Sequence, residues 1–137
     1  MNNTNSARAL ALIRQLVPII RAVRARYSLA GTACSKAHEQ AINHYKRNVS
    51  GGVDRYGVPV LVSPPTKAMI ARNRQLRANV GRLLRAKRRL GALHDKLLNS
   101  CDDLSWTRNN GYKITPAMLA RAEARIAEWK TLRAELR

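Results

Sequence analysis

The sequence of 137 residues has 26 lysines and arginines but only 8 aspartates and glutamates, which gives a formal net charge of +18. The length suits one domain, and the 45% hydrophobic content is enough for a core, which excludes a simple disordered basic tail. The charge argues against an acidic or neutral cytosolic enzyme, and two cysteines argue against a disulfide-rich secreted fold. Because like charges oppose compaction, we expect a polyanionic partner, and nucleic acid is the first candidate.

Residues 1–38 contain no acidic residue and place arginines among Ala, Leu and Ser, a composition that mitochondrial presequences share. A similar basic helix is predicted in the middle of the chain, which argues against reading the first one as a targeting presequence. We therefore expect the protein in a virion or intracellular nucleoprotein particle, with a mitochondrial location as the alternative. An arginine-bearing apolar helix can also lie on an anionic membrane. We expect no membrane span, because no stretch has roughly 18 uninterrupted apolar residues.

The chain predicts an all-α fold of about four helices. The first is predicted over residues 6–27, after a cluster of residues that commonly cap helices. Pro18 is expected to kink or divide it, because proline lacks a backbone donor. Arg14 and Arg21 lie on the side opposite the apolar face. That apolar face is predicted to consist of Leu12, Ile13, Leu16, Ile19, Ile20 and Val23.

A second, weaker helix is predicted over residues 33–48, after a break at Gly31 and Thr32. Its expected buried face is small and consists of Ala33, Ala37, Ala41 and Tyr45. The following residues, 49–65, contain too many glycines and prolines for a helix and are predicted to form a connecting loop. Within it, residues 58–62 are expected to be extended.

The third helix, residues 66–100 with Thr66 as its N-cap, is predicted to be long, basic and amphipathic. Its apolar stripe repeats every seven residues at Met69, Leu76, Leu83, Leu90 and Leu97. The opposite side carries Lys67, Arg74, Arg82, Arg85, Arg88, Arg89 and Lys96. The stripe favours packing on other helices of the chain or of a partner over a parallel zipper, because the positions that share its seam are Asn73, Val80, Lys87 and His94, mostly polar.

After a predicted loop that includes Asp102, Asp103 and residues 109–111, a last helix is predicted over residues 115–136. Thr115 followed by Pro116 is typical of a helix start. One face is apolar and consists of Leu119, Ala122, Ile126, Trp129, Leu132 and Leu136. Its outer side mixes both signs of charge and indicates an ordinary solvated surface.

The positive charge is concentrated in two regions. Residues 1–53 carry +7 and residues 67–96 carry +9, whereas residues 54–66 carry 0 and residues 97–137 carry +2. Arginine predominates, and its planar guanidinium suits phosphate oxygens. The sequence therefore predicts a phosphate-binding surface on the first and third helices. Its predicted residues are Arg14, Arg21, Arg24, Lys67, Arg74, Arg82, Arg85, Arg88, Arg89 and Lys96.

Other chemistry has little support. Cys34 with His38, and His94 with Cys101, could in principle supply four zinc ligands, but their spacing matches no common motif. A disulfide between the two cysteines remains open. No nucleophile elbow, phosphate-binding glycine loop or paired-carboxylate motif is present. We therefore expect no enzymatic activity, no metal, no cofactor and no small-molecule substrate.

The order of the helices and the arginines at residues 8–26 and 67–89 resemble the small helical major coat proteins of filamentous archaeal viruses. That resemblance covers size, helix order and charge along the whole chain, and it rests on no diagnostic motif. It implies a structural protein that wraps duplex DNA, favoured over RNA, as paired subunits without enzymatic activity. The Gly/Pro-rich residues 50–66 have no counterpart in it.

Two other classes remain open. One is a ribosome- or RNA-associated basic protein, which would bind folded RNA within a larger particle. The other is a phage or plasmid DNA-binding accessory factor. In all of these classes part of the apolar surface is expected to be buried in a homo- or hetero-oligomer.

Overall fold

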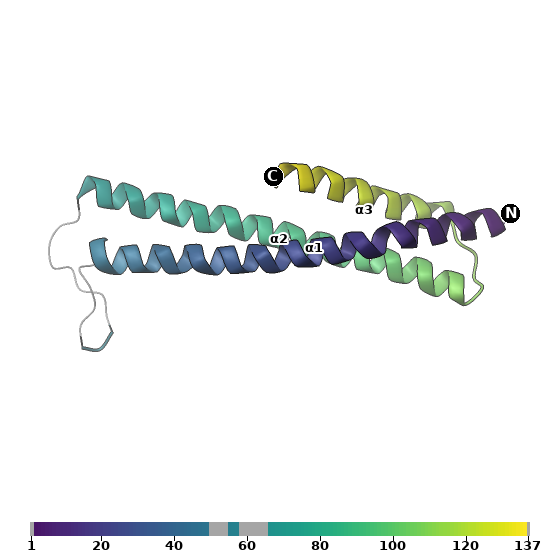
Figure 1. Cartoon of the computed structure of the whole chain (residues 1–137), viewed down its shortest axis with the longest axis horizontal. Helices are drawn as coiled ribbons and strands as arrows, with labels where there is room; N and C mark the ends of the chain where they lie inside the picture. The colour runs from purple at the N-terminus through teal and green to yellow at the C-terminus, as the bar shows by residue number, and fades with distance from the viewer. Residues whose placement is uncertain (1, 50–54, 58–65, 137) are drawn as a thin grey trace. The chain divides into compact units, whose positions relative to one another are not determined.

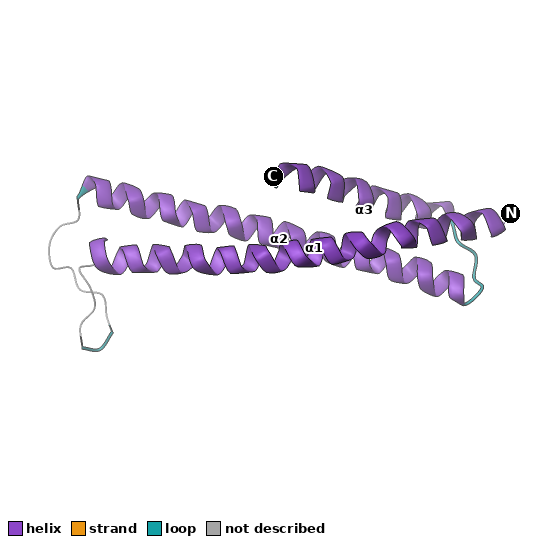
Figure 2. Cartoon of the chain, viewed as in Figure 1, coloured by secondary structure: helices purple, strands orange, loops and turns teal. Residues whose placement is uncertain are grey.

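The computed structural model describes residues 2–49, 55–57 and 66–136, and this part of the chain is helical with no strand (Figures 1 and 2). Helix α1 spans Asn2–His44 and continues into a π-helical turn, η1, at Tyr45–Val49. Helix α2 spans Lys67–Asn109 and helix α3 spans Pro116–Glu135. The all-α prediction is confirmed. The predicted extended piece at residues 58–62 lies outside the described residues.

The predicted number of helices was wrong, because the first two predicted helices form one continuous helix, α1. Gly31 and Thr32 do not interrupt it, and a single helical glycine costs only about 1 kcal/mol relative to alanine. A Cβ atom at Gly31 would lie 3.6 Å from Cε of Lys87, so the glycine sits where another helix segment packs close. Pro18 lies inside α1 at an exposed position, where water can bond the carbonyl group that its missing donor leaves free.

The predicted end of the third helix was also wrong, because α2 continues from Ser100 to Asn109. Asp102 and Asp103, which were expected in a loop, are therefore helical. The apolar stripe explains the extension, since Cys101 and Leu104 follow Leu97 at helical spacing and both are buried. The starts of α2 and α3 agree with the sequence. Oγ1 of Thr66 accepts a hydrogen bond from the Met69 amide at 3.2 Å, and Oγ1 of Thr115 accepts one from the Met118 amide at 3.3 Å.

The chain divides into two compact units, and each long helix contributes to both. Unit 1 consists of residues 1–28 and 88–137, and unit 2 consists of residues 29–87. Within unit 1, the first part of α1, the last part of α2 and α3 lie side by side (Figure 1). Among the described residues of unit 2, the helices that pack are the last part of α1 and the first part of α2.

Contacts in unit 1 fix the helix directions. Arg24 on α1 contacts His94 on α2, while Tyr27 contacts Gly91, so α1 and α2 are antiparallel. A Cβ atom at Gly91 would lie 3.1 Å from the Tyr27 ring, so only a residue without a side chain allows this approach without displacing the ring. Ion pairs described below show that α3 is antiparallel to α2.

The core of unit 1 is built largely of leucine and isoleucine. All three helices, and Ile114 in the loop between α2 and α3, contribute fully or nearly fully buried side chains to it. These are Ala9, Leu12, Leu16, Ile20, Val23, Leu90, Leu93, Leu97, Cys101, Leu104, Ile114, Leu119, Ala122, Ile126, Trp129 and Leu132. The predicted apolar faces of the first and last helices are thus the buried ones, except that Ile13, Ile19 and Leu136 are half-buried.

Unit 2 buries much less. Among its described residues, only Ala37, Ala41 and Leu76 are buried, and the larger apolar residues of α2 at Met69, Val80 and Leu83 are half-buried. The difference follows from the number of helix segments, because a pair of segments encloses less apolar surface than three.

We predict that Leu97→Ala, at a position with no exposed surface, lowers the free energy of unfolding by about 2–5 kcal/mol because it leaves a cavity in unit 1. Leu29→Ala, at a side chain that is 68% exposed, is the matched control and should change it by less than about 0.5 kcal/mol. Urea denaturation followed by circular dichroism measures both. Similar losses in the two variants would contradict the described core.

Candidate nucleic-acid interface

The outward side of α2 in unit 2 carries cations that form no ion pair with a carboxylate among the described residues. Lys67, Arg74 and Arg85 are exposed and lie seven and eleven residues apart, which places them along one side of the helix. The buried Leu76 lies on the opposite side. None of the three forms an ion pair with any described residue. We call Lys67, Arg74 and Arg85 the unpaired α2 row.

Arg82 lies beside this row and is also exposed. Its Nη2 atom donates a hydrogen bond of 2.7 Å to Oδ1 of Asn79 on the same helix. This bond orients the guanidinium without neutralising its charge. Arg82 therefore adds a fourth full charge to the outward side of α2 in unit 2.

The two units differ in how far their charge is compensated. Unit 2 contains eleven basic and two acidic residues, whereas unit 1 contains fifteen basic and six acidic residues, so each has a net charge of +9. Unit 1 is the longer of the two, and its three glutamates, Glu123, Glu128 and Glu135, form ion pairs with its arginines and lysines. The positive charge of unit 2 is therefore the more concentrated and the less compensated.

Three predicted phosphate-binding residues of unit 1 are exposed and form no ion pair with a described residue, namely Arg14, Arg21 and Arg88. Arg14 and Arg21 lie on the solvent side of α1, opposite the buried Leu16. Arg24 is also exposed, but its Nε atom lies 3.3 Å from Nε2 of His94. It is thus held against α2.

Two other predicted phosphate-binding residues face α3 and form ion pairs with its glutamates. Nη2 of Arg89 lies 2.8 Å from Oε2 of Glu135, and Nζ of Lys96 lies 3.5 Å from Oε1 of Glu128. All four side chains are about half exposed, so these pairs contribute little stability, typically ~0–1 kcal/mol each. They do reduce the positive charge that Arg89 and Lys96 can offer to a ligand.

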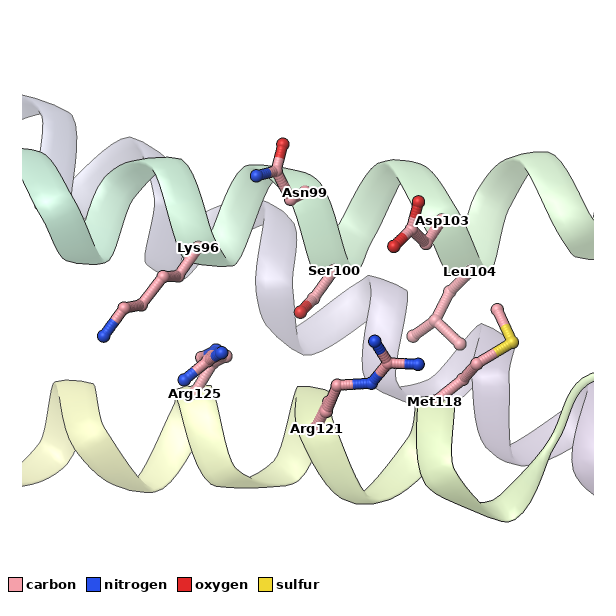
Figure 3. A pocket seen from close by; sticks show the side chains of 8 residues that line it. All are labelled: Lys96, Asn99, Ser100, Asp103, Leu104, Met118, Arg121 and Arg125. Atoms are coloured by element: carbon pink, nitrogen blue, oxygen red, sulfur yellow. The ribbon is translucent and has the colours of Figure 1, made fainter.

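A second cationic feature lies between α2 and α3 and was not predicted from the sequence. Figure 3 shows this pocket, where Lys96 and Ser100 point from α2 toward α3 and Arg121 reaches back toward α2. Arg125 completes the cationic lining, and its Nη1 atom lies 3.7 Å from Oε2 of Glu128. Asp103 also lines the pocket and offsets part of its charge. The pocket has the groups to hold a phosphate, but carboxylates share it.

Sequence reasoning assigned Arg125 to an ordinary solvated surface and did not single out Arg121. Their spacing of four residues does place them on one side of α3. The sequence alone could not show that α3 lies beside α2. That packing places these two arginines in one pocket with Lys96.

The residues that could hold zinc are not gathered in one place within a unit. Cys34 and His38 belong to unit 2, while His94 and Cys101 belong to unit 1. Among the described residues, no group of three or more His, Cys, Asp or Glu side chains could hold a metal ion. Both cysteines are free thiols. Burial is the main reason that the pKa of the Cys101 thiol is raised, with a hydrogen bond to Ser105 acting in the opposite direction.

A comparison with known protein families, curated proteins and solved structures finds no match to this chain. In the described part of the chain, no helix has both the length and the apolar character that crossing a membrane requires.

We predict that Cys34, which is half-buried, reacts with iodoacetamide at pH 8 at least several-fold faster than Cys101. The reason is that the thiolate is the nucleophile, and a raised pKa together with burial lowers its availability at Cys101. Cys34→Ser and Cys101→Ser variants leave one thiol each and allow mass spectrometry to follow them separately. Equal alkylation rates of the two cysteines in the folded protein would contradict the buried position of Cys101. As a control, the two alkylation rates should become equal in urea.

Proposed function

We propose that this protein is a non-enzymatic structural protein that binds the phosphate backbone of nucleic acid, preferably duplex DNA, and coats or packages it. The observation that carries the proposal is the unpaired α2 row. Exposed surfaces of stable proteins usually mix both signs of charge, as the outer side of α3 does here. An uncompensated row on a helix is instead suited to a continuous line of negative charge.

The dimensions of the row support this proposal. Lys67 and Arg85 are separated by about 27 Å at 1.5 Å per residue along a straight helix. Duplex DNA presents one negative charge per roughly 1.7 Å of its axis, so several phosphates lie within that span. Binding would release condensed counterions, which is the main source of sequence-independent affinity. It would also relieve the repulsion among the eleven basic residues of unit 2.

The coat or packaging role is the finer part of the proposal. It is supported by the resemblance in size, all-helical architecture and arginine-bearing helices to the coat proteins of filamentous archaeal viruses. Contacts to phosphate along helices fix position without reading sequence, which suits a protein that covers long stretches of DNA. The role further requires that subunits assemble on the DNA, and a virion or other nucleoprotein particle would be its location.

The test compares two double variants with the same change in net charge. Arg74→Glu with Arg85→Glu removes two charges of the unpaired α2 row, whereas Lys130→Glu with Arg133→Glu alters exposed cations of α3. We expect the first pair to weaken binding to a 30-base-pair duplex by at least roughly tenfold at 0.1 M salt. It should also reduce the slope of log affinity against log salt by about two, because two phosphate contacts are lost.

The α3 pair should weaken binding only slightly, through the lower overall charge. Fluorescence anisotropy at several salt concentrations measures both, and circular dichroism checks that the helices remain. If the two double variants lose affinity equally, net charge alone accounts for binding and the α2 row is not the interface.

A wild-type preference for folded RNA over duplex DNA would reject duplex DNA as the ligand. Electron microscopy with long duplex DNA should show regular filaments, and discrete site-bound particles would contradict the coating role.

A further inference from the structure

An exposed aromatic pair at the end of α2 is not used by the proposed phosphate contacts. The rings of Trp106 and Tyr112 are stacked, with centroids 5.3 Å apart and planes only 9° from parallel. The two side chains are 61% and 62% exposed. The other tryptophan of the chain, Trp129, is 4% exposed, so Trp106 is the tryptophan that solvent and ligands can reach.

The C-terminal cap of α2 holds this pair in place. The amide of Tyr112 donates to the Thr107 carbonyl at 3.0 Å, and the amide of Gly111 donates to the Arg108 carbonyl at 3.2 Å. Gly111 has a φ of +73°, which an L side chain rarely adopts. This arrangement is a Schellman motif, in which the residue after the glycine contacts the last turn of the helix. The backbone therefore fixes where the Tyr112 ring lies.

The cap contact requires an apolar side chain at each position, but it does not require two aromatic rings. Leucine at Trp106 would fill the same role against Tyr112. Two parallel rings that remain more than half exposed present flat π surfaces to solvent, and exposed aromatic rings of this kind are the platforms on which nucleobases stack. On a chain with a net charge of +18, a nucleic acid is the partner that the overall field attracts.

We propose that Trp106 and Tyr112 form a stacking site for an unpaired nucleobase. This inference rests on the proposed function, because the basic helix surfaces bring the nucleic acid to the pair. Bases inside a duplex are already stacked on their neighbours, so the site takes bases of single-stranded segments and of frayed duplex ends. It thus adds a preference for ends or gaps to a protein that otherwise follows the duplex backbone.

The charges near the pair are balanced. Asp102 and Asp103 precede Trp106 by about one turn of α2, while Arg108 and Lys113 follow it in sequence. Local attraction for phosphate is therefore weak, and stacking must supply the selectivity. Stacking is tolerant of base identity, since every base has a π face. The site is consequently expected to distinguish unpaired from paired bases rather than one sequence from another.

The experiment uses tryptophan fluorescence of the full chain with oligothymidine, which has unpaired bases, and with covalently closed circular duplex DNA, which has no ends. Oligothymidine should quench the emission of the wild-type protein. Trp106→Leu keeps the apolar cap contact and leaves the buried Trp129 as the only tryptophan, and with selective excitation of tryptophan it should show no quenching. Removal of one stacked ring should weaken oligothymidine binding by roughly 5- to 150-fold, while binding to the circular duplex changes by less than about twofold.

Tyr112→Leu provides a second variant with the cap contact retained, and it should weaken oligothymidine binding in the same direction. Unchanged oligothymidine binding in both variants would overturn the proposal, and so would equal losses for the circular duplex. A change in Trp106 emission with protein concentration alone would overturn it in favour of a second copy covering the pair. If the circular duplex does not bind to the wild-type protein at all, the proposed function fails, and that result is distinguishable from a loss confined to oligothymidine.

Discussion

The structure depends on one constraint, which is that α3 belongs to unit 1. There it contributes apolar cover through residues such as Leu119 and Trp129, and it contributes carboxylates through Glu123, Glu128 and Glu135. The same helix therefore completes the core of unit 1 and neutralises part of its charge. Unit 2 contains no part of α3, and its described helical residues belong to α1, η1 and α2.

This constraint explains why the same net charge of +9 has different consequences in the two units. In unit 1, Arg8 lies 2.9 Å from Glu123, and Arg89 and Lys96 have glutamate partners. In unit 2, the basic residues on the outer side of α2 repel one another along the helix. The apolar core of this unit is also small. A polyanion that bound to the outer side of α2 would supply the missing counter-charge, which is why we propose this surface as the place where phosphate binds.

The sequence predicted the buried side of each helix well, because apolar periodicity is a local property. Leu16 and Leu97 are fully buried as expected, and Thr115 caps α3 as its position before Pro116 indicated. Helix boundaries were less predictable. A single glycine such as Gly31 breaks an isolated helix more readily than one that packs against a neighbouring segment, and that packing is a tertiary property.

The candidate interface was predictable only in part for the same reason. Helical spacing placed Arg74 and Arg85 on one side of α2, and neither forms an ion pair with a residue that the structure describes. The helical spacing in the sequence could not show that Arg89 and Lys96 form ion pairs with glutamates, since those glutamates lie more than thirty residues away in sequence. Nor could it show the approach of Arg121 to α2. The stacked pair of Trp106 and Tyr112 was missed because residues 101–109 were expected to be a loop.

The central claim is that phosphate binds to the outer side of α2 in unit 2. Hydrogen–deuterium exchange with and without duplex DNA tests it most directly, because exchange reports on local opening along each helix. Residues 67–87 should exchange more slowly when duplex DNA is added, since the bound phosphates remove the repulsion that favours opening. The α3 residues 116–135 should show little change. Protection confined to α3, or no protection in residues 67–87, would contradict the account.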